Sequence, residues 1–519
     1  MNSEEVFKTE NCEERDTERF TDTSNAEKIN QVFGNKIRYD HRRKRWLVWK
    51  DHRWQPDVDG AINRMAIDAS RVRYQAATEI SDLNQRTIAS KWAIQSESRL
   101  RLDAATSIAK NLLPIADSGE NWDSDPMLLS CLNGIVDLRT GKIRKGLPGD
   151  RITMVTGGKY DPDADCPLWK KFISEVFEDN QDLINYVKKA LGYSLTGEMK
   201  EQAVFFCFGV GSNGKSVLFS TIREILGDYA YNAPATLFQR NTMATSSNDV
   251  ASTEFKRFIM SAEILSSTKI NELRLKKWSG GDQETARYLY SEYFSFYPAC
   301  KIWLFVNHKP QVEDDSFGFW RRVRLIPFNR VFSESEQDKD LTKKLKNELS
   351  GILNWLIEGC LLWQAEGLQP LPAIIEGATK SYQAENDVLA EFLFDCIEET
   401  ENDSQAMAVF KKYKEWAEMQ GLQGKDTLTN TSFGRRMSDK FPKRMVDGRV
   451  FYRGISIKGG FSRGFAVPEV IVDPHFHKSP LIKTRINSLV KTTSNPLPRH
   501  ENPLPTKSAQ IPPGLQGIL

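Results

Sequence analysis

The stretch GVGSNGKS, residues 209–216, has the residue types and the spacing that bind a chain of phosphates. It satisfies the pattern Gly-x-x-x-x-Gly-Lys-Ser and lies between an apolar run and a helical pattern. The glycines let backbone N–H groups turn towards phosphate oxygens, the lysine reaches the outer phosphates, and the serine hydroxyl binds Mg²⁺. The start of the following helix adds positive charge. An ordinary glycine turn is the alternative, but the pattern favours binding of ATP with Mg²⁺. The predicted contacts are Gly209, Val210, Gly211, Ser212, Asn213, Gly214, Lys215, Ser216 and Val217.

Two later runs of apolar residues end in side chains that nucleotide hydrolysis needs. RFIMSAEI offers Glu263, and an acid at the end of a neighbouring strand holds the water shell of the magnesium and polarises the attacking water. KIWLFVNH stops at Asn307, whose amide could orient that water or sense the γ-phosphate. The alternatives are a surface glutamate and an asparagine that caps its strand before Pro310. We predict Ser216 and Glu263 as metal ligands, and Lys215, Glu263 and Asn307 as catalytic residues.

A pair of arginines, Arg321 and Arg322, lies just ahead of another apolar run, VRLIPF. Adjacent residues of an extended chain point to different sides, so one of the two could reach into the nucleotide site of a neighbouring subunit. An arginine donated in this way stabilises the charge of phosphoryl transfer. The alternative is a structural ion pair with Asp314 or Asp315.

The segments around these motifs predict a multidomain α/β fold with a P-loop, AAA+-like ATPase core. Strand-like runs alternate with helical stretches after the glycine loop, which is typical of a layered α/β domain. Apolar residues spaced three and four apart before the loop predict helices. Three short helices closed by a β-hairpin would make a winged-helix-like module near the C-terminus. The expected organisation is an acidic disordered tail at 1–30, a helical N-terminal domain with short strands at 31–165, a helical collar at 166–200, the ATPase domain at 201–330, a helical connector at 331–383, the winged-helix-like module at 384–460, and a flexible proline-rich tail at 461–519.

Composition excludes several classes of protein. Apolar residues make up 40% and charged residues 27% of the 519 residues, and no apolar stretch approaches the roughly 18 residues that cross a bilayer. The seven cysteines lie far apart without zinc spacing, so we expect reduced thiols. With no secretory signal, the expected location is the cytoplasm, without a membrane partner. Basic and aromatic residues alternate in NKIRYDHRRKRWLVWKDHRW, which fits either a nucleic-acid backbone or a solvated strand with tryptophans facing a core.

Five motifs together resemble a known family. GVGSNGKS, KRFIMSAEI, LKKWSGGDQETARYLY, KIWLFVNHKP and FWRRVRLIPF, in this order and spacing, are similar to the C-terminal helicase of phage, plasmid and poxvirus primase-helicases, a group of superfamily 3 helicases. WLVWKDHRWQPD and LLSCLNGIVDLRTGKI also resemble the helical domain that precedes the motor in that family, so the likeness covers roughly residues 38–460.

The resemblance implies a role for each motif. Residues 209–216 correspond to Walker A, Glu263 to the Walker B acid, Asn307 to sensor 1, and Arg321 or Arg322 to the arginine finger. The stretch 271–290 corresponds to the hairpin that faces the central pore. Its cations could follow DNA phosphates, or could instead form a charged helix face. The DNA-contact residues predicted there are Lys276, Lys277 and Arg287.

Two features depart from the family pattern. The Walker B strand has one acidic residue where many relatives have two, so Glu263 would have to serve both the metal and the water. The large N-terminal primase domain of many relatives has no counterpart in these 519 residues, and clustered aspartates or zinc-binding cysteines are not found. We therefore expect no priming activity in this chain, and a separate primase or polymerase is a possible partner.

The expected function is an ATP-dependent DNA helicase that forms a ring, expected to be a hexamer, and moves along single-stranded DNA at forks during replication of a phage, plasmid or other mobile element. The cations Arg435, Arg436, Lys440, Lys443 and Arg444 of the C-terminal module could hold duplex DNA, or could be solvated on a protein-contact module. One alternative function is a DNA-binding initiator or scaffold whose ATP site drives assembly without unwinding. A second alternative is a protein- or RNA-remodelling AAA+ ATPase, but the stretch GGDQETAR makes this alternative less favoured.

Overall fold

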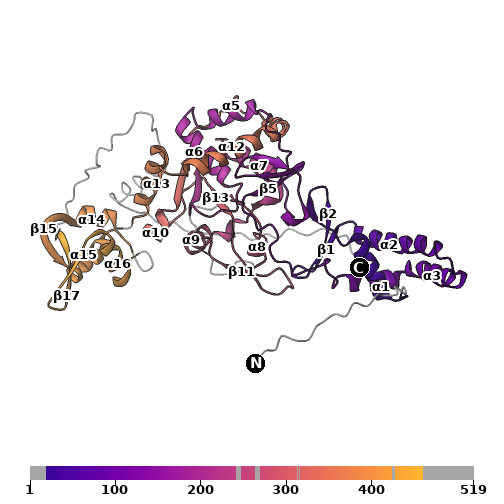
Figure 1. Ribbon diagram of the computed structural model, residues 1–519. Coiled ribbons are helices and arrows are strands. Elements are labelled where there is room, and N and C mark those ends of the chain that lie inside the picture. The colour runs from indigo at the N-terminus through magenta and orange to yellow at the C-terminus, as the bar shows by residue number, and fades with distance from the viewer. Residues whose placement is uncertain are drawn as a thin grey trace, which may run out of the picture. The chain divides into compact units, whose positions relative to one another are not determined.

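The computed structural model describes residues 19–240, 247–262, 269–312, 314, 316–387, 389–422 and 427–459. The chain divides into two compact units, Met1–Ile457 and Lys458–Leu519, and every helix and strand described here lies in the first (Figure 1). Within the described residues, no helix is both long and apolar enough to cross a membrane. The cysteines that the structure describes are buried and form no disulfide with one another, as expected for reduced thiols (Cys131, Cys166, Cys207, Cys300, Cys360 and Cys396).

The N-terminal part of the unit is helical with short strands, as predicted. Its four-stranded sheet has the order β3-β2-β1-β4, and α1, α2 and α4 pack on one another beside it. The predicted disordered tail is too long, because α1 begins at Asp22, where Thr21 caps the helix by accepting a hydrogen bond from the Ser24 N–H at 3.2 Å. The elements are α1 (Asp22–Phe33), β1 (Ile37–Asp40), β2 (Arg45–Lys50), β3 (Arg53–Pro56), α2 (Ala61–Thr78), α3 (Leu83–Ser96), α4 (Arg99–Ala109) and β4 (Ala116–Asp117).

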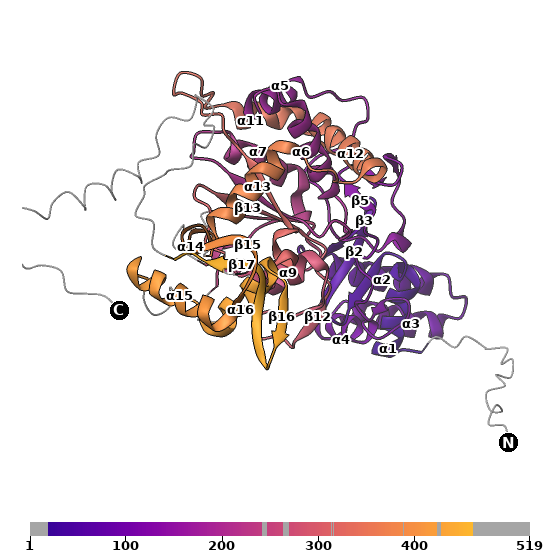
Figure 2. The same ribbon diagram turned by 90° about the vertical axis from the view of Figure 1, so that its left-hand side faces the viewer.

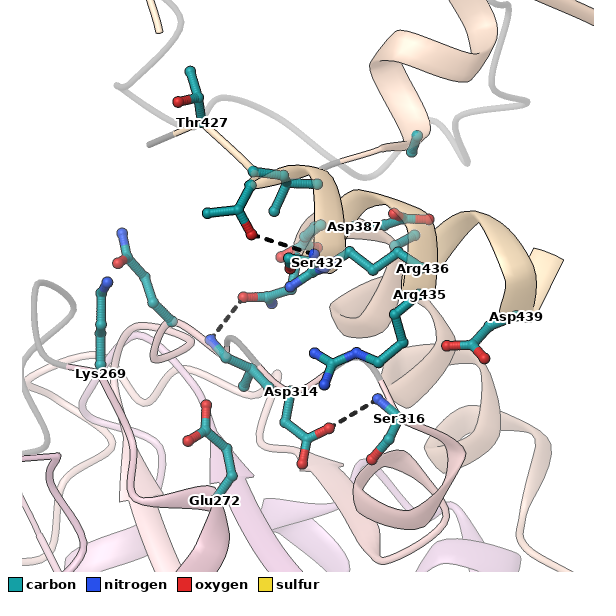
Figure 3. A pocket seen from close by; sticks show the side chains of 18 of the residues that line it. Lys269, Glu272, Asp314, Ser316, Asp387, Thr427, Ser432, Arg435, Arg436 and Asp439 are labelled. Atoms are coloured by element: carbon teal, nitrogen blue, oxygen red, sulfur yellow. Dashed lines mark hydrogen bonds between the residues drawn. The ribbon is translucent and has the colours of Figure 1, made fainter. Parts of the chain in front are cut away.

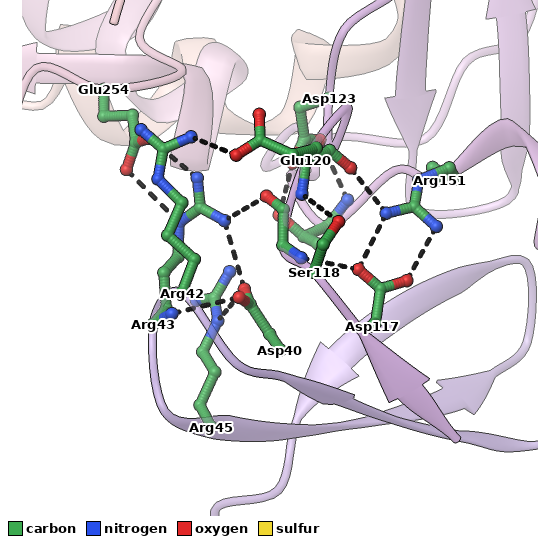
Figure 4. A network of polar contacts seen from close by, with 12 residues as sticks. Asp40, Arg42, Arg43, Arg45, Asp117, Ser118, Glu120, Asp123, Arg151 and Glu254 are labelled. Carbon is green, nitrogen blue, oxygen red and sulfur yellow. Dashed lines mark hydrogen bonds and ion pairs between the residues drawn. The ribbon is translucent and has the colours of Figure 1, made fainter. Parts of the chain in front are cut away.

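The basic turn between β1 and β2 is tied to the following domain by ion pairs (Figure 4). Arg43 Nη2 lies 2.7 Å from Glu254 Oε1, and Arg43 also pairs with Asp40 at 3.1 Å. Arg42 donates to the backbone carbonyl of Ser295 at 2.9 Å. Trp54, from the aromatic part of the same stretch, is buried. The basic and aromatic residues here therefore serve the sheet and its domain contact, in agreement with the structural alternative.

A small antiparallel sheet and a pair of helices precede the central sheet. The sheet has the order β5-β6-β7. Helices α5 and α6 bury the apolar faces that the sequence predicted, and α6 crosses α12 so closely that a Cβ on Gly192 would lie 2.2 Å from the backbone nitrogen of Cys360. The elements are β5 (Leu128–Cys131), β6 (Gly134–Asp137), β7 (Lys142–Arg144), α5 (Pro167–Val176), α6 (Gln181–Tyr193) and α12 (Leu349–Glu366).

A five-stranded parallel sheet forms the centre of the unit, with the order β14-β8-β13-β10-β9 (Figure 1). Side chains alternate between its faces: Phe205 and Cys207 of β8 join the core with α5, α6, α7 and α12, while Val204 and Phe206 join the core with α9 and α13. The elements are β8 (Val204–Phe208), α7 (Lys215–Leu226), β9 (Ala230–Asn232), α8 (Ser247–Ala251), β10 (Phe258–Ser261), α9 (Glu272–Gly280), β11 (Glu284–Ala286), β12 (Phe294–Phe296), β13 (Lys301–Val306), α10 (Phe317–Trp320), β14 (Val323–Pro327), α11 (Leu341–Leu345) and α13 (Ala373–Glu385).

The C-terminal part of the unit (Figure 2) has its own core. In this core the ring of Phe392 meets those of Tyr413 and Phe433 edge to face. The helix predicted to run through VLAEFLFDCIEE ends at Cys396, and a strand follows that pairs antiparallel with β17. The part therefore holds a three-stranded sheet, β15-β17-β16, in place of a lone hairpin, and its winged-helix assignment stays a prediction. The elements are α14 (Ala390–Cys396), β15 (Ile397–Gln405), α15 (Ala406–Met419), α16 (Asn430–Lys440), β16 (Lys443–Val446) and β17 (Arg449–Ile457).

Candidate functional site

The glycine-rich loop joins the end of β8 to the start of α7, as predicted from the sequence. Gly214 precedes the helix with φ +81°, and a Cβ there would lie 2.6 Å from the Val176 side chain. A Cβ on Gly209 would lie 2.4 Å from the carbonyl oxygen of Phe328. Both glycines are thus required by close neighbours, and Gly214 also by its backbone conformation.

The loop is held from outside by the segment that follows β14. Phe332 donates its N–H to the carbonyl of Ser212 at 2.8 Å, and the buried Asn213 amide donates to the carbonyl of Phe328 at 3.3 Å. These two bonds leave the N–H groups of the loop and of the first turn of α7 unclaimed by this segment. The arrangement is a preformed cradle for an anion at a helix N-terminus.

Lys215 lies at the first position of α7 with its side chain folded back over the loop. Its ammonium donates to the Gly209 carbonyl at 2.5 Å, and the residue is only 7% exposed. Burial of the ammonium lowers the pKa of Lys215. A phosphate beside it would therefore meet a poorly hydrated cation, whose charge acts more strongly than it would in water. Ser216, next in the chain, is exposed.

A cavity of about 580 Å³ opens above the loop. Its walls come from α5, from the loop and the first turn of α7, and from the segment 332–342. Charges of both signs line its sides, with the cations Lys171 and Lys339 and the acids Glu175, Glu336 and Asp338, and the ammonium of Lys171 lies 3.8 Å from Glu175. The volume is in the range of a small-molecule site. The glycine cradle, the buried lysine and the exposed serine hydroxyl fit a nucleoside triphosphate with Mg²⁺.

Asn307 lines the same cavity from the end of β13. The strand lies directly beside β8, with Val306 opposite Phe208, and Gly209 donates its N–H to the Val306 carbonyl at 3.3 Å. The structure therefore brings Asn307 to the phosphate loop. That its amide orients the attacking water or senses the γ-phosphate stays a prediction. Glu263, the predicted acid, lies outside the described residues; β10 ends at Ser261, on the far side of β13 from β8.

Arg321 and Arg322 lie at the opposite edge of the sheet. They precede β14, whose first residue pairs with Val204, while its last pairs with Phe208 next to the phosphate loop. Five residues of strand separate the two edges, which is about 16 Å at 3.3 Å per residue. The arginines are thus too far away to act on a nucleotide in the cavity of their own subunit by direct contact.

The two arginines have different surroundings. Arg321 donates to the Gln202 side chain at 2.6 Å, and Arg322 donates to the carbonyl of Gly318. Within the described residues, the buried Nε of Arg322 has no hydrogen-bond partner. The predicted alternative, an ion pair with Asp314, is not found, because Asp314 pairs with Lys276 at 2.6 Å; Asp315 lies outside the described residues.

The lysines predicted on the pore hairpin lie on a helix instead. Lys276 and Lys277 belong to α9, and Lys277 pairs with Glu284 at 3.3 Å. The family resemblance placed the hairpin over residues 271–290, but Gly280-Gly281 end the helix, with Gly281 at φ +75°. Both lysines lie on a charged helix face and are paired with acids, and their contact with DNA stays a prediction.

The hairpin itself is formed by β11 and β12 and has an aromatic tip. The antiparallel pair runs from Glu284 opposite Phe296 to Ala286 opposite Phe294, and residues 287–293 connect the strands. Tyr290 is 98% and Tyr293 62% exposed, with the guanidinium of Arg287 4.8 Å from the Tyr293 ring. Arg287 is thus on the hairpin as predicted. Its tyrosines were missed, although RYLYSEYFSFY is visibly rich in aromatic residues.

The predicted cations of the C-terminal module are not one basic surface. Arg436 is buried, and two others are paired, Lys440 with Asp387 at 2.6 Å and Arg444 with Asp403. Arg435 and Lys443 are exposed. The prediction of a phosphate-binding patch of all five residues is therefore wrong for Arg436, while a role for the exposed pair stays a prediction.

Comparisons with known proteins confirm the resemblance to the primase-helicase family. Residues 26–178 match the family described as "D5 N terminal like", and residues 384–473 match "Poxvirus D5 protein-like". The chain is 28% identical over 322 residues to "Putative helicase L207/L206" of Acanthamoeba polyphaga mimivirus, which covers 57% of this chain and 33% of that protein. It is 24% identical over 418 residues to "Putative helicase 022R" of Frog virus 3, covering 64% and 42% respectively.

Another similar protein carries a different name. "Putative primase C962R" of African swine fever virus is 22% identical over 325 residues, covering 57% of this chain and 34% of that protein. The chain thus spans a third to two fifths of the length of these relatives. Among solved structures, the A form apo structure of the NrS-1 C-terminal region aligns with 83% of this chain and 98% of its own length, at 13% identity and a TM-score of 0.45.

Proposed function

We propose that the chain is the motor of a replicative DNA helicase of superfamily 3, which forms a ring, a hexamer in our proposal, and hydrolyses ATP between subunits. The observation that carries the proposal is the separation of two parts of one site on one sheet: the phosphate loop at one edge and the arginine pair at the other. Neither edge is sufficient alone, and a ring places the second edge of one subunit against the first edge of the next. The names of the viral relatives support helicase chemistry.

In this site Lys215 would bind the β- and γ-phosphates, and Ser216 with Glu263 would hold Mg²⁺. The metal supplies neutralisation of the phosphate charge when bound. Asn307 sits beside the loop, where its amide would orient the attacking water. The arginine of the neighbouring subunit would stabilise the charge that develops on the transferred phosphoryl group.

The hairpin tip is the proposed contact with single-stranded DNA. Its chemistry differs from that of the predicted lysines, because Tyr290 and Tyr293 offer ring faces on which bases of any sequence stack. Arg287, over the ring of Tyr293, would add a cation for the backbone. Forked DNA, a separate primase or polymerase, and a host-cell cytoplasm location complete the proposal. The relative named "Putative primase C962R" is the reason for keeping a priming partner.

Strand displacement tests the function. We expect the protein with ATP and Mg²⁺ to displace the labelled strand of a forked duplex, and Lys215→Ala to displace none, because the buried ammonium is lost from the phosphate site. Displacement is followed by gel or fluorescence. ATP turnover by an assembled oligomer without displacement would instead favour the rival function, a DNA-binding initiator or scaffold, and turnover that ignores single-stranded DNA would favour a protein- or RNA-remodelling ATPase.

Substitution at the hairpin tip tests the DNA contact. Loss of one stacking ring costs about 1–3 kcal/mol. Tyr290→Ala should therefore weaken binding of a fluorescent oligo-dT at least about fivefold, with ATP binding unchanged. Tyr290→Phe is the matched control, because it keeps the ring and should bind as the wild type does. Equal binding by all three proteins would remove Tyr290 from the DNA path.

A further inference from the structure

The Asp314 carboxylate joins two elements that serve different parts of the proposed motor. Its Oδ2 accepts from the ammonium of Lys276 on α9 at 2.6 Å. Its Oδ1 accepts from the N–H of Ser316 at 2.9 Å (Figure 3). Ser316 is the residue that caps α10, and its hydroxyl accepts from Phe319. One carboxylate thus fixes α10 relative to α9.

The two elements lead directly to the hairpin and to the arginine pair. On one side, α9 is bound to the first residue of β11, because Glu284 accepts from the buried Trp278 indole at 2.7 Å and pairs with Lys277. On the other side, α10 ends at Trp320, and Arg321 caps it by donating its N–H to the Phe317 carbonyl at 3.0 Å. The pair Lys276–Asp314 therefore lies between the base of the hairpin and the start of the arginine pair.

The charges of this pair are partly withdrawn from water. The side chains are 33% exposed for Lys276 and 23% for Asp314. Burial alone would raise the pKa of the Asp314 carboxyl, but the hydrogen bonds from Lys276 and Ser316 bring it below its ordinary value. The carboxylate is thus ionised and engaged on both oxygens at neutral pH, which suits a fixed connection better than a mobile surface contact.

We propose that Lys276 and Asp314 are positioning residues that couple the hairpin to the arginine pair, so that DNA at the hairpin changes the rate of hydrolysis at the neighbouring subunit. This rests on the proposed function and deepens it. It also replaces the phosphate contact that the sequence suggested for Lys276. In this proposal, a shift of α9 moves the Asp314 carboxylate through Lys276, and the carboxylate in turn moves the start of α10.

The test compares ATP turnover with and without saturating oligo-dT in the full-length protein. Lys276→Ala and Asp314→Ala should each lower the stimulation by DNA at least threefold, while turnover without DNA and affinity for oligo-dT stay within about twofold. Because both changes break one interaction, the double variant should be no worse than either single one. The exchanged pair, Lys276→Asp with Asp314→Lys, should regain part of the stimulation. Lys188→Ala is the matched control, because it breaks the 2.7 Å ion pair between α6 and Glu358 on α12. Oligo-dT should stimulate its ATP turnover as much as that of the wild type.

Four results would overturn the inference. If Lys276→Ala weakens oligo-dT binding and lowers its salt dependence by about one ion, while Asp314→Ala does not, then Lys276 is a phosphate contact. Additive losses in the double variant would mean that the two residues act independently. Normal stimulation in both single variants would leave the proposed function standing and remove the coupling alone. A wild-type protein whose turnover ignores DNA would instead overturn the proposed function, and the inference with it.

Discussion

The two edges of the central sheet are built in contrasting ways. At the carboxyl edge, the phosphate loop is closed in by its own subunit: Lys215 is buried, both glycines are in close contact, and the segment 328–332 holds the loop from behind. At the amino edge, Arg321 and Arg322 end a short helix, and Arg321 is exposed. The first edge is preorganised for a ligand, whereas the second presents charge outward. A nucleotide site assembled from both edges would exist only between subunits.

Mixing two inactive variants gives the largest expected effect on this comparison. One variant, Lys215→Ala, removes the lysine of the first edge, and the other, Arg321→Ala with Arg322→Ala, removes both arginines of the second. Each protein alone should lose at least about a hundredfold in ATP turnover. In a randomly mixed ring of equal parts, about one quarter of the interfaces combine an intact lysine with intact arginines, so turnover should recover to about one quarter of wild type. The measurement is steady-state phosphate release.

The control for this mixture is a protein that carries all three substitutions. Combined with Lys215→Ala, it offers no intact phosphate loop, so turnover should stay at the background level. If the first mixture also stays at background although both variants oligomerise and the arginine variant still binds ATP, then the arginines do not act across an interface.

A smaller effect distinguishes the two arginines. Gln202 holds Arg321 through a 2.6 Å hydrogen bond, while the Nε of Arg322 has no partner among the described residues. If Arg322 is the residue that reaches a neighbour, Gln202→Ala should change turnover by less than about twofold, as expected for loss of one exposed hydrogen bond. Gln202→Glu, which would hold Arg321 more firmly, is the matched control. A tenfold loss in either variant would assign the finger to Arg321.

The sequence predicted the first edge better than the rest of the molecule. The phosphate loop, α7, β13 and β14 could be predicted because glycine spacing and apolar runs depend on local backbone geometry. Asn307 could be placed at the loop because a parallel strand brings its carboxyl end to the same edge. The position of Arg321 and Arg322 ahead of β14 could also be predicted from the sequence. Their hydrogen-bond partners could not, because side-chain pairing depends on which strands are neighbours.

The errors have physical causes. The hairpin was expected over residues 271–290 from the family resemblance alone; the buried Leu275 and Trp278, three residues apart, show a helical spacing in the first part of this stretch. The strand β15 has the sequence IEETENDSQ, which has little intrinsic β preference, and it forms because β17 lies beside it. Such non-local pairing leaves no pattern in the strand's own residues.

The short strand β14 connects the two edges within one subunit. Arg321 and Arg322 lie directly before it, with Arg321 exposed, and Phe328 and Phe332, in the segment that follows it, hold the phosphate loop through Asn213 and Ser212. In the proposed ring, β14 of each subunit would therefore link two neighbouring active sites, because the arginines before it serve one site and the segment after it supports the phosphate loop of the other. Filling one site would bias the affinity of the next, and we expect ATP saturation curves to be sigmoidal or multiphasic, with simple hyperbolic behaviour restored in rings diluted with the arginine variant.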